Sequence, residues 1–239
     1  MPSSNPNFPE TSWTLVLAAG AHGANALSHL CSAYWPPVYA YIRRRGYSPE
    51  AAQDLTQEFF LQILARPFFA RADPNQGRFR SFLMGSVKFL LADQADFRNA
   101  LKRGGGHTQL PFPLAGAETH YAPEPSHNDT PDRLFERQWA WTVIHRVTAH
   151  LQDELTRQGR ADQFDLFRGF LIGQSEVAYP ELAARSGISE GALRTGASRF
   201  RKRFAELLRA EVASTVASPA DIDAELRFLI AALQGKAPE

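Results

Sequence analysis

The sequence predicts an all-α fold with two helical domains joined by a flexible linker. No segment keeps the period-2 alternation of a strand, whereas several long segments place apolar residues at helical spacing. Three helix starts pair a hydroxyl N-cap with proline at the first helical position: Ser48-Pro49, Thr130-Pro131 and Ser218-Pro219. These observations favour helices throughout.

Composition sets broad limits on function. The 239 residues suffice for two small domains, and the net charge of +1 means that any nucleic-acid affinity must come from local patches. The single Cys31 excludes an internal disulfide framework and fits a reducing cytosol. No apolar run reaches membrane-span length, and no basic segment precedes the apolar residues 13–19. We therefore expect a cytoplasmic protein without membrane insertion.

The first 23 residues form an N-terminal extension, with a mobile tail over residues 1–11 and a short helix from Trp13 to Ala19. A longer helix is expected from Ala24 to Arg45. Pro36-Pro37 should kink it or divide it in two, because each proline removes a helical hydrogen bond. Its expected apolar face consists of Leu27, Leu30, Tyr34, Val38, Tyr41 and Ile42.

The next helix, from Pro49 to Ala65, has one apolar and one acidic side. Its buried side is expected to consist of Ala52, Leu55, Phe59 and Ile63, and its polar side of Glu50, Asp54, Gln57 and Glu58. Asp54 and Glu58, one turn apart, repel each other by a few tenths of a kcal/mol. The polar side is either an ordinary solvated surface or a docking face for a basic partner.

A third helix, from about Phe79 to Lys102, ends in basic residues and then Gly104-Gly105-Gly106. Its expected buried stripe is Phe79, Phe82, Leu83, Val87, Leu90 and Leu91, with Phe89 on or near it. The basic end either complements the helix dipole or contacts phosphates.

Residues 106–130 read as a linker rich in Gly, Pro, His and Asn, and residues 131–213 as the second domain. Its helix from Pro131 to Arg157 directs inward Leu134, Trp141, Ile144, Val147, Leu151 and Leu155; a helix over residues 162–172 adds Phe164, Phe167 and Phe170. A C-terminal extension, residues 214–239, contains a helix from Ala220 to Leu233 whose apolar face is Ile222, Leu226, Leu229, Ile230 and Leu233.

The stretch from Val177 to Phe204 is typical of a helix-turn-helix followed by a basic amphipathic helix. Leu182 and Ala183 lie on the first helix, Gly187 supplies the turn, and Ile188 is expected to fill the space beneath it. Ser189 is a good N-cap, and Leu193, Ala197, Phe200 and Phe204 form one apolar stripe. From Arg194 to Arg209 there are six basic residues and one acid. This pattern favours DNA binding over an ordinary helical hairpin with a solvated basic face.

Nothing in the sequence indicates an enzyme, a metal site or a cofactor. There is no Walker loop and no serine-centred elbow, and no strand precedes the three glycines. His22, His29 and Cys31 lack a fourth ligand, and the linker histidines His107, His120 and His127 lack ligand spacing.

Two motifs together resemble the bacterial RNA polymerase sigma factors of the extracytoplasmic-function (ECF) class. Residues 54–60 (DLTQEFF) are similar to the family's core-polymerase-binding helix, and Tyr179–Phe204 to the domain that reads the minus-thirty-five promoter element. The resemblance covers about Ala24–Gly105 and Phe135–Ala213. The stretches SWTLVLAA, AYWPPVYAYIRRRG and ELRFLIAAL resemble a subgroup with a C-terminal extension. Such subgroups are often encoded beside serine/threonine kinases rather than an anti-sigma factor, so either is a candidate regulator.

The resemblance implies a function for each domain. Residues 24–105 would be a region-two-like domain that binds core polymerase and the minus-ten element, and residues 131–213 a region-four-like domain that binds the minus-thirty-five element. The implied polymerase-binding residues are Asp54, Gln57, Glu58 and Phe59. The minus-ten residues are Lys88, Arg98, Asn99, Lys102 and Arg103. The minus-thirty-five residues are Ser189, Glu190, Arg194, Thr195, Ser198, Arg199, Arg201 and Lys202.

Two positions depart from the family pattern. The melting segment has no tryptophan and offers only Phe82 and Phe89, which we expect to be core residues, and Gly196 stands where many relatives have a long basic residue. Two alternatives stay open: a polymerase-independent, dimeric helix-turn-helix regulator, and a helical adaptor that a kinase regulates at Thr56, beside the acidic face.

Overall fold

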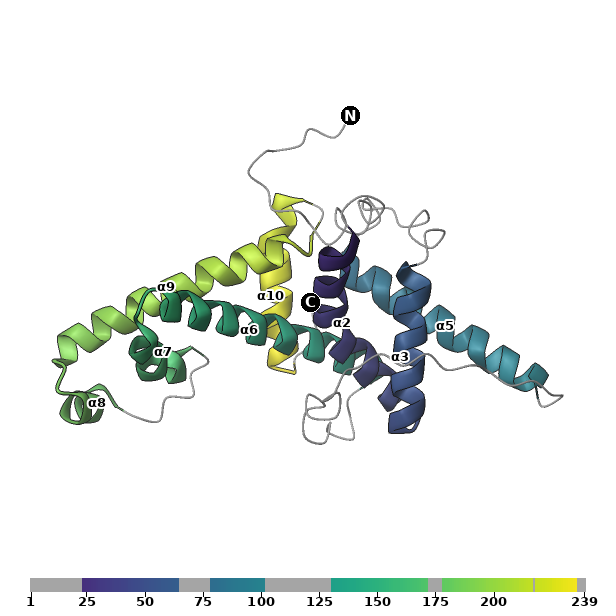
Figure 1. Ribbon diagram of the computed structural model, residues 1–239, viewed down its shortest axis with the longest axis horizontal. Helices are drawn as coiled ribbons and strands as arrows, with labels where there is room; N and C mark the ends of the chain where they lie inside the picture. The colour runs from purple at the N-terminus through teal and green to yellow at the C-terminus, as the bar shows by residue number, and fades with distance from the viewer. Residues whose placement is uncertain (1–22, 65–77, 102–129, 172–177, 217, 236–239) are drawn as a thin grey trace, which may run out of the picture. The chain divides into compact units, whose positions relative to one another are not determined.

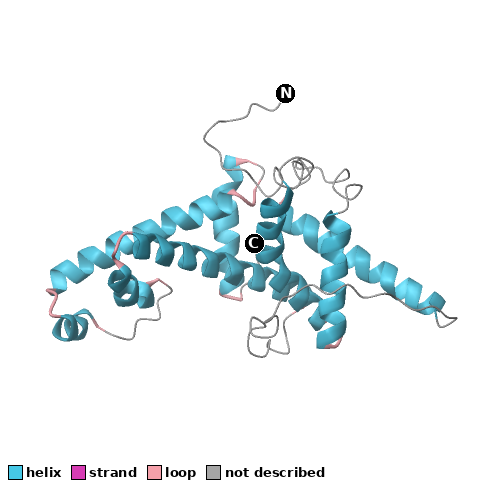
Figure 2. Ribbon diagram, viewed as in Figure 1, coloured by secondary structure: helices cyan, strands magenta, loops and turns pink. Residues whose placement is uncertain are grey.

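The computed structural model describes residues 23–64, 78–101, 130–171, 178–216 and 218–235 (Figure 1). Over these ranges every regular element is helical, as predicted, and the remainder is turn and loop (Figure 2). The predicted helix from Trp13 to Ala19 and most of the predicted linker lie outside the described residues.

The helices follow one another in a simple order. They are α2 (Gly23–Arg44), α3 (Pro49–Leu64), α5 (Phe79–Leu101), α6 (Pro131–Arg157), α7 (Ala161–Phe167), α8 (Tyr179–Ser186), α9 (Glu190–Ala213) and α10 (Ile222–Leu233), with 3₁₀ turns at Arg168–Phe170 and Pro219–Asp221. The chain divides into two compact units. Unit 1 comprises residues 1–142 and 213–239, and unit 2 comprises residues 143–212. The first two-fifths of α6 thus belong to unit 1.

Helix α2 runs through Pro36 and Pro37 as one helix, so of the two predicted outcomes, a kink or a division, the division is excluded. Missing amide donors weaken a helix by about 3 kcal/mol or more per proline, but burial can offset this loss. The residues around the prolines are almost entirely buried, among them Tyr34, Val38 and Ile42. Tertiary packing therefore keeps this helix whole.

Helices α2, α3 and α5 share one aromatic core in unit 1. Ser48 begins α3 as predicted, since its Oγ accepts the amide of Ala51 at 3.2 Å. Tyr34 of α2 packs edge-on against Phe79 of α5 at 5.3 Å between ring centroids. Trp35 stacks on Phe60 of α3 at 5.7 Å. Phe82 is only half-buried.

The C-terminal helix α10 buries Ile222 and Leu229 as predicted, but the rest of its buried face differs from the predicted one. Its buried residues are Ile222, Glu225, Phe228, Leu229 and Ala232, whereas Ile230 is exposed. Phe228 lies against Trp139 of α6, with ring centroids 6.2 Å apart. Trp139 is therefore the buried tryptophan of α6, and Trp141, which was expected to point inward, is half-buried. This face is buried because the Phe228 ring packs against Trp139.

Unit 2 packs α7 and α9 around three phenylalanines. Phe164 and Phe167 of α7 both contact Phe200 of α9, with centroid separations of 6.1 and 5.9 Å. The α-helix ends at Phe167, earlier than predicted, and continues as a 3₁₀ turn. Phe170 is consequently only half-buried and stacks on Tyr179 at the start of α8, with centroids 5.1 Å apart.

Candidate nucleic-acid interface

The turn between α8 and α9 forms from local signals. Gly187 has φ +69°, a left-handed conformation that glycine adopts without strain, and its amide closes α8 on the carbonyl of Ala183. Ser189 then starts α9: its carbonyl accepts the amide of Leu193 at 3.0 Å and its hydroxyl accepts that of Ala192 at 3.4 Å. Sequence reasoning predicted both residues in these roles.

The apolar stripe of α9 fixes which of its faces meet solvent. Leu193, Ala197, Phe200 and Phe204 are all buried, as predicted. The polar residues between them are exposed in two adjacent rows. Arg194, Ser198 and Arg201 recur at i, i+4 and i+7, and Thr195, Arg199 and Lys202 recur at the same spacing beside them. The helix therefore presents hydroxyls and guanidinium groups together along its length.

Arg194 is held in place by two neighbours. Its Nε donates to the Glu190 carboxylate at 2.9 Å, and its guanidinium lies 4.7 Å from the ring centroid of Tyr179. An ion pair and a stacked ring restrict a side chain that otherwise has many rotamers. The hydroxyl of Thr195 donates to the carbonyl of Gly191 at 2.9 Å.

The other basic residues of α9 fall into two groups. Arg199, Arg201 and Lys202 are exposed, and among the described residues no hydrogen bond or ion pair engages their side chains. Arg203 instead pairs with Glu154 of α6 at 2.7 Å. The hydrogen bonds from Arg203 lower the pKa of Glu154, and those to Glu154 and Glu206 raise the pKa of Arg203.

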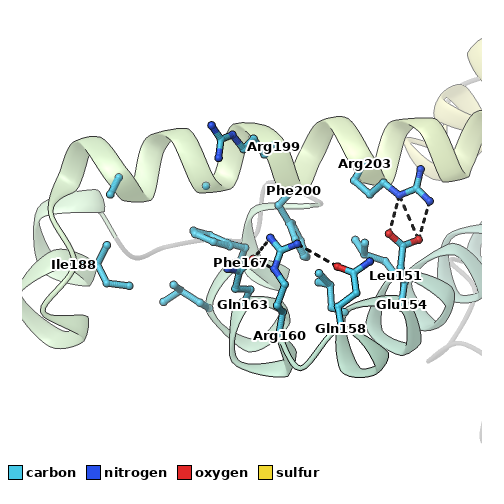
Figure 3. Close-up of a pocket in the computed structure, with 14 residues that line it drawn as sticks. Leu151, Glu154, Gln158, Arg160, Gln163, Phe167, Ile188, Arg199, Phe200 and Arg203 are labelled. Carbon is cyan, nitrogen blue, oxygen red and sulfur yellow. Dashed lines mark hydrogen bonds and ion pairs between the residues drawn. The ribbon is translucent and has the colours of Figure 1, made fainter.

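A pocket of about 570 Å³ lies between α6, α7 and α9 (Figure 3). Apolar side chains, including Leu151, Phe167 and Phe200, line part of it, and arginines stand around them. Arg160 is fixed there by bonds to Gln163 at 2.6 Å and Gln158 at 3.1 Å. Arg199 also lines the pocket, whereas Arg194 and Arg201 of the neighbouring row do not.

The sequence predicted that Ile188 fills the space beneath the turn, and this prediction is wrong. Ile188 is 39% exposed and lines this pocket. The turn needs no apolar plug because Gly187 and the Ser189 cap already satisfy its backbone groups.

Gly196 has a packing role that the sequence did not reveal. A Cβ built on this residue would lie 2.6 Å from Cζ of Phe167, closer than carbon atoms approach without displacement. The absence of a side chain lets the Phe167 ring pack directly on the α9 backbone. The glycine thus serves the core of unit 2, at the cost of one position on the polar surface.

The acidic face of α3 is partly exposed and includes an apolar residue. Asp54 is exposed, while Gln57 and Glu58 are half-buried. Leu61, seven residues after Asp54 and three after Glu58, is 56% exposed on the same side. Sequence reasoning missed it, although its position outside the buried stripe was a usable signal.

Glu58 is held by hydrogen bonds from two glutamines. Gln62 Nε2 donates to its carboxylate at 3.0 Å, and Gln94 Nε2 of α5 lies 3.0 Å from both of its oxygens. These donors partly offset the repulsion expected from Asp54. Phe59 is buried against Phe60 and supports the face from the core side.

The structure corrects two expectations about this region. Thr56 is fully buried and its Oγ1 donates to the Ala52 carbonyl at 2.6 Å, so a kinase would reach it only after local unfolding. Phe89 is 70% exposed rather than on the buried stripe. Leu90 and Leu91 already fill that stripe, and Phe89 falls outside its arc.

Lys88 is the one predicted minus-ten residue whose side chain is described. It is exposed and forms an ion pair with Asp132 in the first turn of α6. The hydrogen bond to Asp132 raises the pKa of Lys88, more than burial lowers it. The side chains of Arg98 and Asn99, and the whole of Lys102 and Arg103, lie outside the described residues.

A buried ionic cluster joins the start of α5 to α10. Glu225 is fully buried and accepts from Arg78 Nε at 2.8 Å and from Arg80 Nε at 2.7 Å. The Arg80 guanidinium lies 3.4 Å from the Phe228 ring centroid and 5.4 Å from that of Trp139. Sequence reasoning missed this cluster; the signal was an acid three residues after Ile222, inside the apolar face of α10.

Comparison with known proteins gives one match. Residues 30–99 match the family model Sigma-70 region 2, a span that reaches from α2 into α5. Searches of curated proteins and of solved structures found no match. The matched region supports a sigma factor family, whose members are non-enzymatic factors of transcription initiation. It also implies binding to the core RNA polymerase and to promoter DNA.

None of the described helices has the length and apolarity required to cross a membrane.

Proposed function

We propose that this chain is an ECF-type sigma factor with a C-terminal extension, which directs core RNA polymerase to specific promoters and initiates transcription in the cytoplasm. The observation that carries the proposal is the Sigma-70 region 2 match, because it contains the acidic face of α3 and most of α5, including Lys88 and Arg98. The remaining assignments extend this match with the geometry of the described residues.

The α3 face is the proposed polymerase-docking surface. Asp54, Gln57 and Glu58 supply acidic and polar groups that a basic partner would neutralise, and Leu61 supplies an exposed apolar contact. Gln94 holds the Glu58 carboxylate in position before docking. Pre-positioned groups lower the entropy cost of association, which supports this surface as a built interface.

The α5 helix is the proposed minus-ten reader. Its predicted contacts are Lys88, Arg98, Asn99, Lys102 and Arg103. Phe89 adds a candidate stacking surface, because an exposed ring beside a lysine fits single-stranded DNA, where each stacked base contributes about 1–3 kcal/mol. Such contacts offset the few kcal/mol required to unstack a base, so strand opening requires no ATP hydrolysis by the factor itself.

Helices α8 and α9 are the proposed helix-turn-helix for the minus-thirty-five element. Arg194 and Thr195 are assigned to base edges, since Glu190 and Tyr179 orient the guanidinium near the start of α9. Arg199, Arg201 and Lys202, whose side chains have no partner in the described part of the chain, are assigned to phosphates. Ser189 and Ser198 complete the polar surface.

The decisive experiment is run-off transcription with purified core polymerase on a library of promoter sequences. We expect specific initiation by the wild type and its loss in the Asp54→Ala/Glu58→Ala variant. Asp153→Ala/Asp162→Ala removes two exposed acids of unit 2 and is the matched control. If the wild type neither initiates transcription nor binds core polymerase in a pull-down, the sigma factor proposal is wrong.

The roles within α9 are separable by DNA binding. Arg201→Ala should weaken binding to all sequences alike and reduce the salt slope by about 1, because one phosphate contact is lost. Arg194→Ala should change the preferred sequence, with about 1–3 kcal/mol lost at one base pair. Identical behaviour of the two variants would contradict the assignment.

A polymerase-independent regulator is the second candidate, favoured by Arg199, Arg201 and Lys202 of α9, which are exposed and engage no other described residue. It would dimerise to read paired half-sites. Sedimentation separates the two functions: a monomer without duplex affinity in the absence of polymerase excludes the regulator.

The signal that activates the factor is proposed to come through a serine/threonine kinase or an anti-sigma factor. Thr56 is a poor phosphate acceptor because its hydroxyl is buried.

A further inference from the structure

The cations at the beginning of α5 are all engaged by acids from beyond the predicted linker. Between residues 78 and 94 there are three basic residues, Arg78, Arg80 and Lys88. Arg78 and Arg80 bind Glu225 of α10, and Lys88 binds Asp132 of α6. Glu136, one turn after Asp132, adds an oxygen 3.8 Å from Arg80. All of these residues belong to unit 1.

The Glu225 end of this arrangement is an anchor. Arg80 and Glu225 are 4% and 0% exposed, and the Arg80 guanidinium is covered by Phe228 and Trp139. Trp139 lies on α6 and Phe228 on α10, so the same cluster connects both helices to α5. A buried ion pair is weak evidence for added stability, but it specifies one arrangement of the helices that it joins.

At the other end, the ion pair between Lys88 and Asp132 is exposed, so another anion can replace the carboxylate. The side chains of Lys88 and Asp132 are 48% and 40% exposed. Pairs of this kind contribute about 0.2–1 kcal/mol, so a phosphate group can displace the carboxylate. Asp132 nevertheless places a negative charge where a nucleic-acid phosphate would bind Lys88. Each phosphate contact by Lys88 must first replace this internal partner.

We propose that the first turns of α6 and helix α10 form an acidic cover on α5, an autoinhibitory contact that competes with nucleic acid for Lys88. The proposal rests on the proposed function, since it takes α5 to be the nucleic-acid-binding helix. Glu225, Phe228 and Trp139 hold the cover in place, and Asp132 occupies the exchangeable position. The C-terminal extension thereby lowers the affinity of the free protein for DNA.

The test is binding of a fluorescein-labelled, single-stranded oligodeoxynucleotide to the full chain, measured by anisotropy over a salt series. Asp132→Asn removes the competing charge and should bind roughly two- to fivefold tighter, the fold-change that corresponds to an exposed ion pair. The slope of log affinity against log salt concentration should steepen by about 0.7, because one additional phosphate of the single strand is contacted. Asp153→Asn, an exposed acid of α6 in unit 2, is the matched control for net charge and should bind like the wild type.

Two further variants test the parts of the cover. Adding Lys88→Gln to Asp132→Asn should abolish the gain, because the freed cation is then absent. Glu225→Gln should weaken the anchor and so, like Asp132→Asn, increase the affinity for the oligodeoxynucleotide. Circular dichroism must show that this variant is folded. If Glu225→Gln does not fold, the Asp132 and Lys88 variants alone decide.

Equal affinities of Asp132→Asn and Asp153→Asn would overturn the proposal. A folded Glu225→Gln chain that binds like the wild type would overturn the part assigned to α10. Run-off transcription separates these outcomes from the sigma factor proposal. Specific initiation without the Asp132 effect rejects only the cover, and the Asp132 effect without core binding or initiation rejects only the proposed sigma function.

Discussion

Helices α5 and α9 are both basic in sequence, yet they present their charge differently. The three cations at the start of α5 are paired with Asp132, Glu136 and Glu225 from distant segments. In α9, Arg199, Arg201 and Lys202 have no partner among the described residues. A count of basic residues therefore does not measure the charge available to a polyanion; the position of acids from the rest of the chain decides it.

The difference implies two modes of binding. A phosphate that reaches α9 gains a charge-assisted contact at once, whereas one that reaches Lys88 must replace a carboxylate. Counterion release should consequently dominate binding by unit 2. Binding by α5 should be more dependent on the state of α6 and α10.

The largest expected effect comes from removing one ion pair of each helix and comparing the losses of unfolding free energy. Glu225→Ala leaves Arg80 buried without its partner, which should cost about 3–5 kcal/mol of unfolding free energy. Glu154→Ala breaks the Arg203–Glu154 pair, in which Arg203 is 44% exposed, and should cost less than about 1 kcal/mol. Urea unfolding measures both. The three described tryptophans, Trp35, Trp139 and Trp141, lie in unit 1, so their fluorescence follows that unit while circular dichroism follows the whole chain. Equal losses would mean that burial does not distinguish the two pairs.

A smaller effect is expected inside unit 2, at Gly196. Gly196→Ala forces the Phe167 ring to move, and overpacking of this kind typically costs about 1–3 kcal/mol. The gain of about 1 kcal/mol in helix propensity offsets part of this cost. Gly191→Ala is the control in the same helix, because nothing lies within 4 Å of its added Cβ; it should be neutral or stabilising.

Thermal unfolding followed by circular dichroism distinguishes the two glycines. Phe167→Leu in the Gly196→Ala background should recover part of the loss, since the shorter side chain leaves room for the methyl group. If Gly196→Ala is as stable as Gly191→Ala, the glycine does not serve the Phe167 contact.

Local features could be predicted from the sequence because their causes lie within a few residues. Gly187 and Ser189 specify the turn between α8 and α9, and the stripe from Leu193 to Phe204 is unambiguous because arginines occupy the other faces. The predicted helix bounds of α3, α5 and α6 agree with the structure to within one residue.

The errors came where a helix offers more than one apolar face. In α10 the sequence favoured Ile230, whereas the structure buries Phe228 because Arg80 and Trp139 receive its ring. Phe89 was assigned to the core for the same reason. Arg80 and Glu225 are 145 residues apart, so no local pattern predicts their contact. Which face is buried depends on the partner helix, and one sequence alone does not identify that partner.

The smallest expected effect is a change in the pH dependence of stability, and it concerns Glu136, one of the acids that pair with α5. Desolvation raises the pKa of Glu136, more than the charge of Arg80 lowers it. The folded state therefore binds a proton more readily than the unfolded state, and ionisation of Glu136 opposes folding as pH rises above the ordinary range of a glutamate. Glu136→Gln should raise the unfolding free energy at pH 7, by less than about 1 kcal/mol, and the difference should shrink towards pH 4.

Glu50 provides a control of opposite sign. A hydrogen bond from its own backbone amide, and then one from Ser48, lower its pKa. Its ionised form thus favours folding above the unfolded pKa, and this contribution is lost as pH falls through the folded value. Glu50→Gln should therefore lower stability at pH 7, and this difference too should close in acid. Urea titrations of the wild type and both variants at pH 4 and pH 7 measure the two signs. A loss of stability at pH 7 in Glu136→Gln would show that attraction to Arg80 outweighs desolvation, and that Glu136 strengthens the contact between α6 and α5 rather than weakening it.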